Sequence, residues 1–85
     1  MKIILNLKQT ATPAEAQAYL QRALSFPDYY GKNLDALHDM LTSWDQPMAF
    51  VLRLPEKGEM AAYGQKLYRV FADSAAENPR ISVRC

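Results

Sequence analysis

Three short runs of apolar residues divide the chain and predict buried β-strands. They cover residues 3–7, 48–54 and 81–85, and each contains several Ile, Leu, Val or Phe residues. A short apolar run that is bounded by turn residues is typical of a strand covered by other elements. The chain is therefore expected to build its core on a three-stranded sheet.

Between these strands, apolar residues recur at the spacing of amphipathic helices. Thr12 and Pro13 are typical of a helix start, because Thr caps the first turn and Pro suits the first helical position. The expected helices are one from Thr12 to the Phe26-Pro27 break, one over 34–43 capped by Asn33, one short helical turn or two over 56–60, and a longer one that ends at Asn78-Pro79.

This alternation of strands and helices predicts an α/β fold. Each connection between two strands is long enough to hold helices and to return the chain in the same direction. We therefore expect a small two-layer structure, with a three-stranded parallel sheet packed with about four helices. Because the chain is short, one face of the sheet should be less fully covered than is usual for a parallel sheet.

The length and composition restrict the function further. An 85-residue chain is expected to form a single domain over residues 1–85, with a thin core and little room for a cofactor cavity. Its single cysteine, Cys85, cannot make an internal disulfide, which suits a reducing cytosol. The N-terminal apolar run is too short for a signal peptide, and no stretch reaches the roughly 20 apolar residues that span a bilayer. We therefore expect a cytoplasmic protein without a cofactor.

Charge is unevenly distributed along the chain, although the formal net charge is only +1. Residues 28–45 carry four aspartates and one lysine, whereas the rest of the chain carries nine Lys or Arg residues and five acids. Such an acidic segment attracts a basic partner and repels the phosphates of nucleic acid. The alternative is that these acids simply keep a helix surface solvated.

The predicted helix over 34–43 separates apolar from acidic residues. Its apolar stripe consists of Leu34, Leu37, Leu41 and Trp44. Asp35 and Asp39 lie four residues apart on a different face, with His38 and Thr42 beside them. Like charges at this spacing weaken an isolated helix by about 0.2–0.5 kcal/mol, and penalties of this kind often mark functional surfaces.

Two tyrosines directly before this helix favour a binding surface. Tyr29 and Tyr30 offer large, rigid contact area, and carboxylates next to aromatic rings suit the side chains of Arg and Lys. We expect Tyr30 to be partly buried in the core. Gly31 follows in the loop and is free to adopt a positive φ angle.

A small metal-assisted hydrolase is an alternative interpretation of His38, Asp35 and Asp39. A histidine flanked by carboxylates can act in acid–base catalysis or hold a metal. However, the sequence shows no second cluster of His, Cys, Asp or Glu, no glycine-rich phosphate loop and no nucleophile elbow. We therefore favour a binding protein over an enzyme, with no catalytic or metal-binding residues.

The segment Pro27–Trp44 closely resembles the signature of the barstar family of ribonuclease inhibitors. Its sequence, PDYYGKNLDALHDMLTSW, matches the family pattern at the Tyr-Tyr-Gly, Asn-Leu-Asp-Ala-Leu and Leu-Thr positions. The order of strands and helices agrees over nearly the whole length, and Val70-Phe71 followed by Asp73 is similar to the family's late helix. Two departures are His38, where the best-known members have Trp, and Asp73, where Glu is expected.

The resemblance implies a barstar-like fold and a one-to-one complex with a basic ribonuclease, whose active site an acidic helix face would occlude by mimicking RNA phosphate. Asp39 would be the leading mimic, and Asp35 would accept a second basic residue. Tyr29 would stack on the enzyme, and Asp73 would add an acid at the rim. The other implied contact residues are Gly31, Asn33, Leu34, His38, Thr42 and Trp44. An immunity protein or a binding module for another basic partner is the alternative, and no direct contact with nucleic acid or membrane is expected.

Overall fold

A computed structural model describes residues 1–85, in which three strands alternate with three helices. The strands are β1 (Lys2–Asn6), β2 (Met48–Arg53) and β3 (Ile81–Arg84). The helices are α1 (Pro13–Ala23), α2 (Leu34–Thr42) and α3 (Glu59–Glu77). The predicted α/β class is confirmed, and the predicted ends of these elements lie within about three residues of the observed ones.

The expectation of about four helices is wrong, because the chain forms three. The sequence predicted a short helical turn over 56–60, but residues 54–58 form a loop that leads directly into α3. Gly58 ends this loop with a positive φ of 72°, a conformation that an α-helix cannot contain and that glycine adopts readily. The helix can therefore start only after Gly58, at Glu59.

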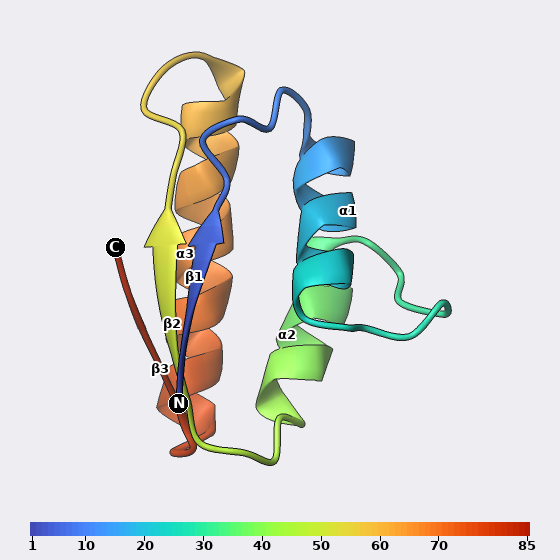
Figure 1. The fold of residues 1–85 in the computed structure, drawn as a ribbon, viewed down its shortest axis with the longest axis vertical. Coiled ribbons are helices and arrows are strands. Elements are labelled where there is room, and N and C mark those ends of the chain that lie inside the picture. Colours follow the sequence, from blue (N-terminus) through green and yellow to red (C-terminus); the bar gives the residue numbers. More distant parts are fainter.

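The three strands form a parallel sheet in the order β1-β2-β3. Figure 1 shows α3 running alongside the strands in the opposite direction, with α1 and α2 further to the right. Along β1, buried Leu5 faces the helices, whereas Ile4 on the opposite face is 48% exposed. The predicted parallel sheet is thus confirmed, and the exposure of Ile4 agrees with an incompletely covered face. None of the helices has the length and apolarity needed to cross a membrane.

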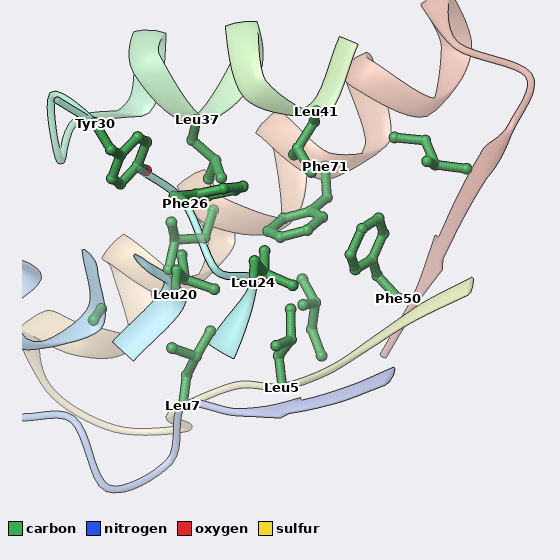
Figure 2. Close-up of a cluster of buried hydrophobic side chains, with 14 of the residues drawn as sticks. Leu5, Leu7, Leu20, Leu24, Phe26, Tyr30, Leu37, Leu41, Phe50 and Phe71 are labelled. Carbon is green, nitrogen blue, oxygen red and sulfur yellow. The ribbon is translucent and has the colours of Figure 1, made fainter. Parts of the chain in front are cut away.

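The core lies between the sheet and the helices, and every helix contributes to it. Its 15 buried apolar residues form one cluster. Phe50 of β2 packs edge-on against Trp44 and against Phe71 of α3, with ring centroids 5.4 and 5.2 Å apart. Leu37 and Leu41 point from α2 into this cluster and are fully buried (Figure 2). One side of α2 is therefore fixed against the core, which turns its other side outward.

A buried polar network holds the loop between α1 and α2. Gln17 of α1 is only 1% exposed, although it is polar. Its side-chain oxygen accepts a hydrogen bond from the Tyr30 hydroxyl, and its amide nitrogen donates to the Tyr63 hydroxyl on α3 at 2.8 Å. Burial, with a smaller contribution from Tyr63, raises the pKa of Tyr30 well above its usual range, so its hydroxyl stays protonated as a donor. The partly buried Tyr30 predicted from the sequence is in fact almost completely buried.

Removing the Tyr30 hydroxyl should destabilise the protein. The Tyr30→Phe variant leaves the Gln17 oxygen buried without this donor, which costs about 1–3 kcal/mol of unfolding free energy. Urea unfolding followed by circular dichroism measures the loss.

Tyr29→Phe is the matched control, because the neighbouring Tyr29 is 85% exposed and its hydroxyl makes no hydrogen bond within the chain. Its unfolding free energy should stay within about 0.5 kcal/mol of the parent protein. Equal losses in the two variants would show that the Gln17 network does not anchor the loop.

Candidate functional site

The end of α1 directs the chain into the loop that precedes α2. Ser25 adopts a positive φ of 55°, and its amide donates to the carbonyl of Arg22. The amide of buried Phe26 donates to the carbonyl of Gln21 at 3.0 Å. These bonds form the helix-ending Schellman motif, with Ser in the position that Gly usually occupies. The left-handed Ser25 therefore ends α1 before the predicted Phe26-Pro27 break is reached.

Gly31 and Asn33 shape the start of α2. The Asn33 side-chain oxygen accepts a hydrogen bond from the amide of Ala36 at 2.7 Å, which confirms Asn33 as the helix cap. Gly31 does not use its freedom to adopt a positive φ, and Lys32 adopts one instead, at 55°. Gly31 matters for space, since a Cβ atom there would lie 3.3 Å from the side chains of Ala36 and Asn33. The chain can therefore turn tightly into α2.

The outward side of α2 carries carboxylates that the chain itself does not use. Asp35 and Asp39 are both exposed, and neither makes an ion pair or a side-chain hydrogen bond within the chain. The Thr42 hydroxyl next to them donates to the backbone carbonyl of His38 at 2.9 Å. Both carboxylates are thus free to accept hydrogen bonds or charge from another molecule.

The other predicted contact residues of the loop and α2 are presented to different degrees. Tyr29, Gly31 and Asn33 are exposed, whereas Leu34, His38, Thr42 and Trp44 are half-buried. Trp44 turns largely into the core, since its ring packs on Phe50 and its indole nitrogen is buried without a hydrogen-bond partner. The predicted contact residues from Tyr29 to Thr42 therefore all reach the surface along one continuous segment, the loop before α2 and α2 itself.

The end of α3 is joined to α2 by two side chains. Glu77 reaches His38, with 2.6 Å between Oε2 and Nε2. Asn78 is 4% exposed, and its amide nitrogen donates to the carbonyls of Leu41 at 3.0 Å and Trp44 at 2.9 Å. The last carbonyls of a helix lack the amide partners of its interior. The Leu41 carbonyl also accepts from the Trp44 amide at 3.2 Å, and Asn78 adds a second donor to it and one to the Trp44 carbonyl just beyond α2.

Asp73, the predicted acid at the rim, is exposed on α3. It borders a shallow hollow on the outer surface of that helix together with Lys66 and Arg69. The acid that reaches α2 is Glu77, one helical turn further along α3. No group of three or more His, Cys, Asp or Glu residues is arranged to hold a metal ion.

Comparison with known proteins identifies the family. The model of the family described as "Barstar (barnase inhibitor)" matches residues 1–84. The chain belongs to the barstar family. A Bacillus subtilis (strain 168) protein named "Putative ribonuclease inhibitor YrdF" is 60% identical over 35 residues, which cover 40% of this chain and 38% of that protein. The similarity to this relative thus spans well under half of either chain.

Sequence reasoning missed three residues that organise this barstar-family surface. Gln17 lies three residues before Leu20 and seven before Leu24, a spacing that places it on the buried side of α1. From the sequence, Asn78 is expected only to mark the end of a helix, because Pro79 follows it. Glu77 follows Asp73 by four residues and so shares its side of α3, but only the packing of α3 on α2 shows which of the two acids meets α2.

Replacing Asn78 should loosen the end of α2. The Asn78→Ala variant removes the donor to the Leu41 and Trp44 carbonyls, and we expect a loss of about 1–3 kcal/mol in unfolding free energy. Amide hydrogen exchange at Ser43 and Trp44 should become faster than in the parent protein.

Asn6→Ala serves as the control for this substitution. Asn6 is exposed, and its side chain accepts a single hydrogen bond, from the amide of Lys8 at 3.1 Å. Its effect should stay below about 1 kcal/mol and leave exchange at the end of α2 unchanged. Comparable losses in both variants would argue against a special role for Asn78.

Proposed function

We propose that this chain inhibits a basic ribonuclease by covering its active site with the loop before α2 and the outward side of α2. The observation that carries this proposal is the exposed pair Asp35 and Asp39, which no cation of the chain neutralises. Membership of the barstar family and the similarity to a protein named as a ribonuclease inhibitor support it.

The inhibitory surface would act as a mimic of RNA phosphate. Ribonucleases hold the RNA backbone with cationic side chains, and carboxylates accept charge-assisted hydrogen bonds from the same donors. Asp39 is the central acceptor, and Asp35 receives a second basic residue. Because Leu37 and Leu41 fix the other side of α2 in the core, little ordering of the helix is required on binding.

The loop would complete the contact beside the acids. The exposed ring of Tyr29 is available for stacking on a side chain of the enzyme, and the absence of a Cβ atom at Gly31 lets the backbones approach closely. Asn33, Leu34, His38 and Thr42 line the same region, with Trp44 and Asp73 at its edges. Tyr30 stays buried and anchors the loop to the core.

In this proposal the chain is a binding protein and not an enzyme. It forms a one-to-one complex in the cytoplasm, where it would protect the cell that produces the ribonuclease. Its acidic surface repels RNA, so it contacts the enzyme and not the nucleic acid. His38, where the best-known family members have Trp, favours a target that differs from theirs, such as the ribonuclease domain of a toxin for which this chain is the immunity protein.

Inhibition can be tested with a panel of small basic microbial ribonucleases and toxin ribonuclease domains. At least one should be inhibited at a one-to-one ratio, and the association rate should fall as salt rises, because charge attraction speeds the encounter. Absence of both inhibition and binding at about 1 μM protein and low salt, across the whole panel, would contradict the proposal.

Asp39→Ala should weaken the complex strongly while leaving the fold intact. Truncating one partner of a buried charge pair costs about 2–5 kcal/mol of binding, a range to which barstar-type complexes themselves contribute. Titration calorimetry measures the loss, and urea unfolding confirms the fold.

Asp45→Ala removes the same charge just beyond the end of α2, from another exposed residue. This control should lose less than about 1 kcal/mol, as expected for a charge at the rim. A loss below about 1 kcal/mol for Asp39→Ala would remove Asp39 from the centre of the surface.

A further inference from the structure

The contact between His38 and Glu77 extends the acidic side of α2 onto α3. Nε2 of His38 lies 2.6 Å from Oε2 of Glu77, and the two side chains are 37% and 60% exposed, respectively. The contact between Lys8 and Glu56 lies elsewhere, after the ends of β1 and β2. His38 with Glu77 is therefore the single side-chain contact of a carboxylate at the candidate surface.

The geometry of this contact determines which nitrogen of neutral His38 carries the proton. A carboxylate can only accept a hydrogen bond, so Nε2 must donate to Glu77. In the neutral ring Nδ1 is then an acceptor. Nδ1 makes no hydrogen bond within the chain, and the only buried side-chain nitrogen or oxygen atoms without a partner are Trp44 Nε1 and Ser74 Oγ. The lone pair of Nδ1 is therefore accessible to solvent.

With His38 in this form, its ring adds an acceptor to the carboxylates of α2 and of the end of α3. The carboxylates of Asp35, Asp39 and Glu77 accept hydrogen bonds, and so does Nδ1 of His38. The Thr42 hydroxyl already donates to backbone carbonyls of α2. A Trp at position 38 would instead offer only an N–H donor. The surface of this chain is therefore suited to a partner that presents N–H donors opposite position 38.

We propose that His38 and Glu77 act as one unit that carries the ribonuclease-binding surface onto α3 and accepts a hydrogen bond from a cationic side chain of the partner. This inference rests on the function proposed above and deepens it. Glu77 is a positioning residue for the His38 ring and also the third acid of the surface. The pair sets specificity, because only an enzyme with a suitably placed Arg or Lys satisfies Nδ1.

The free protein allows a direct test of the His38 state. Nitrogen-15 NMR of the imidazole at about pH 8 should show the tautomer with the proton on Nε2, and Glu77→Ala should shift the ring toward a mixture of tautomers. Finding the proton on Nδ1 in the parent protein, or no change in Glu77→Ala, would overturn the inference. Urea unfolding of the variants shows whether the fold is retained.

Affinity for a ribonuclease identified in the panel tests the role in binding. Glu77→Ala and His38→Ala should each weaken the complex about tenfold. The affinity of the double variant should be no more than about twofold below that of the weaker-binding single variant. The control Glu59→Ala removes an acid from the opposite end of α3 and should cost less than about threefold.

The outcomes separate this inference from the function on which it rests. Additive losses in the double variant, or unchanged affinity in both single variants, overturn the joint role of His38 and Glu77 alone. Failure of the parent protein to bind any ribonuclease overturns the proposed function, and the recognition by His38 falls with it.

Discussion

The burial of one side of α2 is the constraint on which the candidate surface depends. Leu37 and Leu41 have no exposed surface, and burying a leucine side chain fully is worth about 1.5–3 kcal/mol relative to leaving it exposed. Because the side chains of a helix point in fixed directions, this burial commits Asp35 and Asp39 to the solvent side. The chain therefore tolerates two like charges one turn apart, since packing of the helix exceeds the few tenths of a kcal/mol that their repulsion costs.

Buried polar groups hold the segments around α2 in place, in addition to the apolar core. The core fixes the rotation of α2, and two polar side chains hold the segments on either side of it. Gln17 holds the preceding loop through its hydrogen bond with Tyr30. Asn78 holds the end of the helix through the carbonyls of Leu41 and Trp44. Buried hydrogen bonds are directional, so they hold a segment in one position where apolar contacts would allow several. A surface held in this way can bind without first being ordered.

The same packing explains why the acidic surface is shared between two helices. α3 is the longest element, and its last turn meets the middle of α2, where Glu77 contacts His38. A domain of this size has few ways to enlarge a contact area, and a second helix adds charge without lengthening α2. The match to the family covers residues 1–84, nearly the whole chain.

Periodicity in the sequence determined the strands, the helices and the α2 stripe, because local spacing alone decides which side chains share a face. The length of the connections between strands determined the parallel sheet. The Asn33 cap and the exposed acids followed from the same local rules. Gly58 and Lys32 escaped prediction, since their backbone angles depend on where the flanking elements must meet. The partnership of His38 with Glu77 joins residues 39 positions apart, and burial of Gln17 depends on Tyr30 and Tyr63 from two other segments. Such pairings arise only when helices and loops that are distant in the sequence pack together, and the tertiary structure alone decided them.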